Sequence, residues 1–146
     1  MNKDDMISHS SRSAMNITVY KVGKETKLNE HSPYFKKLQS VCENLLITAN
    51  NRLWEFIPPE TISNIKNNEI AIEIIYRSPQ HFKTSFEDGH IQLDRLLIPL
   101  SGYYVFQNKQ LTIIYGYQTY SPGPFINTKG FYEIKELLEA MDIKLD

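Results

Sequence analysis

Apolar residues recur at helical spacing in two long segments of the chain. The first segment follows Ser32-Pro33, which supplies the hydroxyl and the proline expected at a helix start. The second follows Asn127 or Thr128, either of which would serve as its cap, and extends to Met141. Each predicts a helix with one buried stripe. The stripes are Phe35, Leu38, Cys42, Leu45, Leu46 and Ala49, and Phe131, Ile134, Leu137, Leu138 and Met141.

Strands are predicted between and before these helices. The clearest is 70–76, where Ile70, Ile72, Ile74 and Tyr76 share one face, as a period of two requires. Its Glu73 interrupts the outer face and predicts either solvent exposure or pairing with a neighbouring lysine. The other predicted elements are a strand at 16–22 with a turn at 23–26, a strand at 53–57, a helix at 60–67 that buries Ile62 and Ile65, and a hairpin of 103–106 with 111–117.

Another hairpin can be given a register from the sequence. Asp88-Gly89 is a preferred two-residue turn. Leu93 and Leu96 are three residues apart on an otherwise alternating strand, which predicts a β-bulge at Asp94-Arg95. The turn sets the pairs Phe86 with Ile91, Thr84 with Leu93, and Lys83 with Asp94.

The order of these elements favours one α+β domain over residues 16–146. Consecutive hairpin-connected strands predict a mainly antiparallel sheet, with the two main helices packed against one side and the short helix in addition. Residues 1–15 are polar and predict a disordered N-terminal arm.

Composition narrows the class of protein without naming a reaction. The net charge of −1 provides no global attraction for a nucleic-acid polymer or an anionic membrane. The single cysteine excludes an intrachain disulfide, and neither a membrane-spanning run nor a signal peptide is recognisable. We therefore expect a cytoplasmic protein without a membrane partner.

Motifs for known chemistry are missing from the sequence. Phosphate loops, nucleotide fingerprints and zinc-ligand spacings are absent, so we expect no cofactor, no metal and no assigned catalytic residue. Cys42 lies on an apolar stripe and is interpreted as a structural thiol. His81 and His90 lie apart in the predicted hairpin, which favours a solvated hairpin over a metal or acid–base site.

An aromatic, turn-rich segment near the C-terminus is the strongest candidate for a binding site. Glycine and proline fix an irregular backbone there, and the rings offer large faces with polar tips. Tyrosine is enriched in recognition surfaces, although strand tyrosines also commonly cover a core. The predicted contacts are Tyr117, Tyr120 and Phe125, then Tyr103 and Tyr104, with Arg95 beside them.

The C-terminal half resembles small bacterial proteins of no assigned function. The residues that carry this resemblance are 70–76, the run from Asp94 to Gly102, Tyr115-Gly116-Tyr117, and the run from Gly123 to Thr128. The resemblance implies no catalytic residue, because none is known for that group.

Three hypotheses for function follow. The leading one is a non-enzymatic binding module, inhibitor- or immunity-like, that recognises a protein or small ligand through the aromatic loop. A second is a small hydrolase or phosphodiesterase that uses His81 or His90 with Glu87, Asp94 or Arg95. A third is a nucleotide-binding sponge, with Arg95 or Lys83 on the phosphate. An exposed aromatic patch would also suit a homodimer face.

Overall fold

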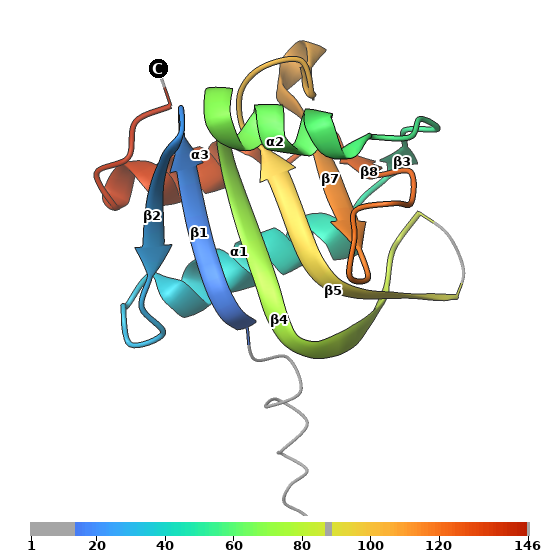
Figure 1. The fold of residues 1–146 in the computed structure, drawn as a ribbon, viewed down its shortest axis with the longest axis horizontal. Coiled ribbons are helices and arrows are strands. Elements are labelled where there is room, and N and C mark those ends of the chain that lie inside the picture. The colour runs from blue at the N-terminus through green and yellow to red at the C-terminus, as the bar shows by residue number, and fades with distance from the viewer. Residues whose placement is uncertain (1–13, 87–88, 146) are drawn as a thin grey trace, which may run out of the picture.

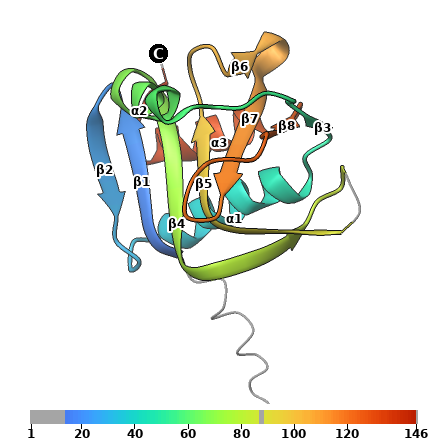
Figure 2. The same ribbon diagram turned by 45° about the vertical axis from the view of Figure 1, so that its right-hand side comes forward.

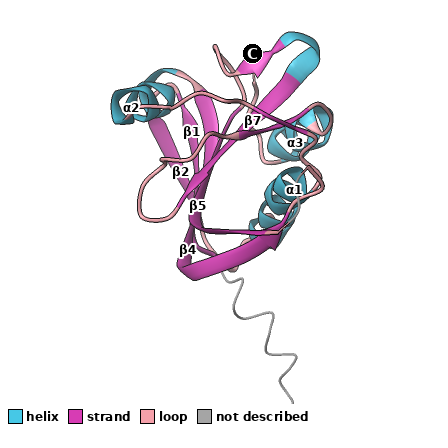
Figure 3. Ribbon diagram, turned by 90° about the vertical axis from the view of Figure 1, so that its right-hand side faces the viewer, coloured by secondary structure: helices cyan, strands magenta, loops and turns pink. Residues whose placement is uncertain are grey.

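The computed structural model describes residues 14–86 and 89–145, and in them a sheet lies between two layers of helix (Figures 1 and 3). The helices α1 and α3 cover one face of the sheet, and the shorter α2 covers part of the other (Figure 3). The described elements are β1 (Ala14–Lys21), β2 (Lys24–Leu28), α1 (Phe35–Ile47), β3 (Asn51–Arg52), α2 (Pro59–Asn68), β4 (Ile70–Lys83), β5 (His90–Pro99), β6 (Val105–Phe106), a 3-10 turn (Gln107–Lys109), β7 (Gln110–Gly116), β8 (Phe125–Asn127) and α3 (Phe131–Ala140).

The eight strands form one sheet in which every pairing is antiparallel. Their order is β2-β1-β4-β5-β7-β8-β3, and β6 pairs with β7 beside this path. The long strands β4 and β5 lie at the centre (Figure 1). The predicted α+β class, with an antiparallel sheet and two main helices against it, is confirmed. Among the described residues, no helix combines the length and the apolar character needed to cross a bilayer.

The main core lies between the sheet and the pair α1 and α3. All six residues of the stripe predicted for α1 are buried, and so are Phe131, Ile134 and Leu138 of α3. The sheet contributes the predicted face of β4 together with apolar residues of β1, β5 and β7. This core holds the sheet in place without any contribution from α2.

A second, smaller core lies on the opposite face of the sheet. Ile62 and Ile65 of α2 are buried there, as the sequence predicts, against Ala71, Leu97 and Ile114 of the strands. The alternation of side chains along β4 places Ala71 and Glu73 on this face and their neighbours in the main core. This second face is therefore only partly apolar.

The N-terminal region contains a hairpin that the sequence analysis did not predict. The turn lies at Val22-Gly23, where both residues have positive φ, and β2 then occupies much of the segment predicted as a turn. The exposed β2 has charged residues instead of apolar alternation, as expected for an edge strand. Of the predicted disordered arm, Ala14 and Met15 belong to β1, and residues 1–13 lie outside the described part.

The predicted register of the β4–β5 hairpin is wrong. Lys83 pairs with His90, Phe82 with Ile91 and Gln80 with Leu93, so the loop between the strands is longer than two residues. An irregularity does lie at Asp94: Gln80 pairs with Leu93, whereas Ile75 pairs with Arg95. The extra residues belong to β4, between Ile75 and Gln80, and lie opposite Asp94. Leu93 and Leu96 both reach the main core, as predicted.

The starts of two helices and the conformation of one predicted strand also differ from the predictions. The helix α1 begins at Phe35, and Ser32 forms the preceding turn by accepting a hydrogen bond from the Tyr34 amide at 3.2 Å. The helix α3 begins after Gly130, because Asn127 belongs to β8, where its side chain donates to the Leu45 carbonyl at 2.9 Å. The strand predicted at 53–57 is instead an irregular segment that follows β3.

Candidate functional site

A cavity of about 470 Å³ lies on the second face of the sheet. The helix α2 and the segment before it form one wall, and the loop after β7 forms another. Strands β4 and β5 contribute one charged residue each. The lining residues are Phe56, Pro59, Ile62, Ser63, Lys66, Glu73, Arg95, Thr119, Tyr120 and Ser121.

Two glycines allow the loop after β7 to fold back onto the sheet. Gly116 ends β7 at a tight turn in which Tyr117 bridges to Thr119, and a Cβ atom at Gly116 would overlap the Thr119 carbonyl. At the other end of the loop, a Cβ at Gly123 would lie 2.8 Å from the Leu53 carbonyl oxygen. The Leu53 amide donates to the Pro124 carbonyl at 2.9 Å. These contacts hold the loop beside the segment that carries Phe56.

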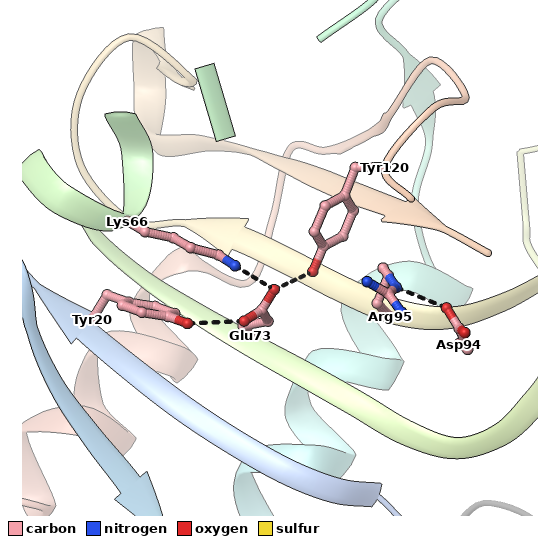
Figure 4. Close-up of polar contacts among 6 residues, drawn as sticks. All are labelled: Tyr20, Lys66, Glu73, Asp94, Arg95 and Tyr120. Atoms are coloured by element: carbon pink, nitrogen blue, oxygen red, sulfur yellow. Dashed lines mark hydrogen bonds and ion pairs between the residues drawn. The ribbon is translucent and has the colours of Figure 1, made fainter. Parts of the chain in front are cut away.

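Glu73 is the centre of the polar network at this site (Figure 4). Its carboxylate is buried and accepts hydrogen bonds from the Tyr20 hydroxyl at 2.9 Å and the Tyr120 hydroxyl at 2.7 Å. The Lys66 ammonium lies 2.9 Å from the Glu73 Oε2 atom and 5.5 Å from the centre of the Tyr20 ring. A buried carboxylate needs such partners, because an unpaired buried charge is very costly.

The two tyrosines that donate to Glu73 remain neutral across the physiological range. Burial raises the pKa of the Tyr120 hydroxyl well above the usual 10.0, and the Glu73 carboxylate raises it further. Burial and Glu73 also raise the pKa of Tyr20. Each phenol therefore keeps its proton, and the network is a fixed set of donors around one negative charge.

Arg95 enters the cavity from β5 and is held by Asp94. The Arg95 Nε atom donates to Asp94 Oδ1 at 2.8 Å, and the backbone amide of Gln118 donates to the same oxygen at 2.9 Å. Burial raises the pKa of the Asp94 carboxyl, but the bonds from Arg95 and Gln118 outweigh it, so the pKa lies below its usual value. The guanidinium also lies 6.0 Å from the centre of the Tyr120 ring.

The cavity offers a ligand charged, hydroxyl and apolar groups. The lining contains two cations, one buried anion, four hydroxyl side chains and an apolar wall. No histidine or cysteine is among the lining residues described, and the oxygens of Glu73 are engaged by Tyr20, Tyr120 and Lys66. The described residues contain no cluster of three or more metal-ligating side chains.

The predicted contact residues fall into two groups. Tyr103 and Tyr117 are exposed, by 71% and 46%, and Tyr120 lines the cavity with its hydroxyl turned inward. Phe125 is wholly buried, stacked on Tyr115 with ring centres 5.3 Å apart. Tyr104 is also buried, and its hydroxyl donates to Glu55 at 3.3 Å. The prediction that Phe125 and Tyr104 are displayed for contact is therefore corrected: both complete the cores.

The residues of the hydrolase hypothesis do not meet at the cavity. His81 on β4 pairs with Gln92, and His90 on β5 pairs with Lys83, so the two histidines are separated by two positions along these strands. Both are exposed, and neither lines the cavity. Glu87 lies outside the described residues. Cys42 is buried in the main core, where burial raises the pKa of its thiol, as expected of a structural cysteine.

The sequence left two alternatives for Glu73, solvent exposure or pairing with a lysine, and the structure shows the second, because Glu73 is buried beside Lys66. Ala71 and Ile75 leave that face of β4 otherwise apolar, which is a signal that the glutamate is buried. Lys66 gave no comparable signal, because a lysine on a short helix is usually exposed. Trp54 and Phe56 were assigned to a strand, but they are 79% and 63% exposed on the segment before α2.

Comparisons with known proteins give no relative from which a role for this site could be inferred. No protein-family model matches the chain, and neither the curated proteins nor the solved structures yield a match.

Proposed function

We propose that this protein is a non-enzymatic binding module that recognises a small ligand or a protein through the face of the sheet that carries α2. The observation behind this proposal is the cavity beside α2, together with the exposed rings next to it. Pockets of roughly 300–1,000 Å³ that combine an apolar wall with a few polar groups are typical ligand sites. The cavity of about 470 Å³ lies within that range.

The exposed rings on this face support the proposal. Phe56 lines the cavity, and Trp54 lies two residues before it in the same segment. Tyr103 lies on the other side of α2, with its ring 4.9 Å from that of Tyr104, and Tyr117 begins the aromatic loop. Aromatic residues contribute disproportionately to binding energy. An inhibitor- or immunity-like role would use this face against a protein partner.

The hydrolase alternative has less support. It requires a histidine and a carboxylate within hydrogen-bond reach inside a concave pocket. His81 and His90 do not line the cavity, and Glu73 already accepts three donors. The carboxylates of Glu73 and Asp94 hold neighbouring side chains in place, and N–H donors of Arg95 remain available.

A thermal-shift screen with matched variants tests the proposal. Metabolites and short peptides are screened for an increase in the melting temperature, because a ligand of the folded state stabilises it by mass action. We expect the stabilising compounds to lose their effect on Phe56→Ala and to keep it on Tyr132→Ala. The control is matched, since Phe56 and Tyr132 are 63% and 68% exposed and Tyr132 lies on α3, across the sheet.

Two outcomes would overturn the proposed function. One is a screen in which no compound or peptide stabilises the wild-type protein. The other is a set of stabilising compounds that act equally on Phe56→Ala, or that fail only on Tyr132→Ala, because their site would then lie elsewhere on the protein.

A further inference from the structure

We infer that the cavity beside α2 takes an anionic ligand with an apolar body, and that the carboxylate or phosphate of this ligand binds to Arg95. The inference rests on the proposed binding function of this face and adds the chemical class of the ligand. Three features carry it: the donors left over at Arg95 and Lys66, the apolar wall opposite them, and the way the arginine is held.

The charged groups that remain available in the lining favour an anion. Two cations, Lys66 and Arg95, face the cavity with one anion, Glu73. The negative charge of Glu73 is offset by Lys66 at 2.9 Å and by the two tyrosine hydroxyls. Asp94 likewise pairs with Arg95 at 2.8 Å, so the two cations and two carboxylates balance in charge. An anion is favoured because the oxygens of Glu73 are occupied, whereas N–H donors of Arg95 remain available.

Arg95 has donors to spare. A guanidinium carries five N–H donors in a planar fork. Its Nε–H is used by Asp94, and within the part of the chain that the structure describes the two terminal amino groups have no hydrogen-bond acceptor. The side chain is 26% exposed and lines the cavity, so a ligand in the cavity can reach it. Carboxylates and phosphates are the groups that match such a fork with two parallel hydrogen bonds.

The arginine is fixed before any ligand arrives. Asp94 Oδ1 accepts from the Arg95 guanidinium and from the Gln118 amide at the same time. Because β5 and the aromatic loop both hold Asp94, the guanidinium loses little freedom when it binds an anion. Preorganisation of this kind lowers the cost of binding.

An apolar wall accompanies the cations. Phe56, Pro59 and Ile62 line the cavity on the α2 side, and Tyr120 adds its ring. Phe56 is 63% exposed without a ligand, and a ligand in the cavity would cover part of that ring. A single aromatic ring with an acidic group is the simplest molecule that satisfies both the fork of Arg95 and this wall.

The test uses four small probes with the same ring and different charges. Phenylacetate and phenyl phosphate are anions, phenylacetamide is neutral and phenethylamine is a cation. Each is titrated into the isotope-labelled full chain, and amide chemical shifts report both the affinity and the location. We expect at least one anion to bind at millimolar concentrations with shifts at the cavity, and the amide and the amine to bind at least about tenfold more weakly. The tighter of the two anions identifies the acidic group.

Variants of two arginines test whether Arg95 is the residue that binds the anion. Arg95→Gln is expected to weaken anion binding roughly tenfold or more, because a charge-assisted hydrogen-bonded pair is lost. Arg77→Gln, at an exposed position on β4, is the matched control and is expected to bind like the wild type. Circular dichroism checks that each variant folds. If Arg95→Gln does not fold, Arg95→Lys, which keeps the charge, replaces it and is expected to lose affinity through the lost fork.

The outcomes separate this inference from the proposed function. Equal binding of phenylacetate and phenylacetamide at the cavity, or unchanged anion binding by a folded Arg95 variant, overturns the inference and leaves the binding face intact. Failure of both anions to bind at millimolar concentrations also overturns it. Shifts confined to the α1 and α3 side would overturn both proposals together.

Discussion

The two faces of the sheet are built in different ways. The face toward α1 and α3 is sealed by buried apolar side chains of five strands and two helices, with the Phe125 ring among them. The other face, on the side of the sheet where α2 lies (Figure 2), has a smaller apolar cluster. Beside this cluster lie a buried carboxylate, a lysine and an arginine (Figure 4), and these three residues line the cavity. Polar groups are costly to bury. If stability alone determined the sequence, we would expect apolar residues on the second face as well.

The contrast between the faces indicates where a binding site can be sought. The first face holds most of the buried apolar residues and hence contributes most of the hydrophobic stabilisation. The second face holds charged groups that are fixed in position and partly accessible, which is the usual condition of a binding site on a rigid scaffold. Substitutions on the two faces should therefore have different consequences, and the following variants are ordered by the size of the expected effect.

The largest loss of stability is expected for Phe125→Ala. This ring is wholly buried and stacked on Tyr115, so its removal should cost about 3–5 kcal/mol of unfolding free energy. The exposed Phe56→Ala on the other face should change stability by less than about 0.5 kcal/mol. Chemical denaturation measures both. Similar losses for the two variants would contradict the distinction between the faces.

A smaller loss is expected for Glu73→Gln. The neutral amide weakens three charge-assisted contacts, from Tyr20, Tyr120 and Lys66, and should cost about 1–3 kcal/mol. Glu136→Gln, at an exposed position of α3, is the control. If Glu73→Gln proves no more destabilising than this control, the buried network does not hold the second face together.

Tyr120→Phe removes one donor and should cost about 1–2 kcal/mol at neutral pH. Its stability should also depend less on alkaline pH. The folded protein raises the pKa of Tyr120 above the usual 10.0, so the native state holds this proton more tightly than the unfolded state. That stabilisation is complete below pH 10 and is lost as the pH rises through the folded pKa. Denaturation of both proteins over this range measures the difference, and parallel curves would refute it.

The smallest change in the free energy of unfolding is expected for Asp94→Asn, and it concerns how stability falls in acid. The native state lowers the pKa of Asp94, so its contribution is present above the usual pKa of 3.8 and is lost as the pH falls through the folded value. Because the ion pair with Arg95 is partly exposed, the contribution should stay below about 1 kcal/mol. The measurement compares acid unfolding of the variant and the wild type. A wild-type curve no steeper in acid than that of Asp94→Asn would contradict it.

The parts of the fold that were predictable from sequence are those where one apolar periodicity dominates. The stripe of α1, the inward residues of α2 and the face of β4 from Ile70 to Tyr76 all lie where their spacing places them. The strand β2 was not predictable in this way, because an exposed edge strand has no apolar face. The wrong register of β4 and β5 arose because Asp88-Gly89 suits a two-residue turn, whereas the strands pair further from it.

The site was only partly predictable for a different reason. The aromatic loop could be recognised from its glycines, prolines and rings, and Tyr120 and Arg95 do line the cavity. Phe125 was assigned to the same surface because sequence spacing cannot distinguish a ring that points into the core from one that points outward. Lys66 and Glu73 meet only because α2 crosses the second face, and local sequence contains no information about that packing.

Chemical-shift mapping of the isotope-labelled protein with phenylacetate and phenyl phosphate is the decisive test of whether the α2 face binds ligands, because both faces of the sheet are observed in one spectrum. Our account predicts that the shifted amides lie around Phe56, Arg95 and the loop from Tyr117 to Gly123, while α1 and α3 stay unchanged. Shifts confined to α1 and α3, or no shift from either anion, would contradict it.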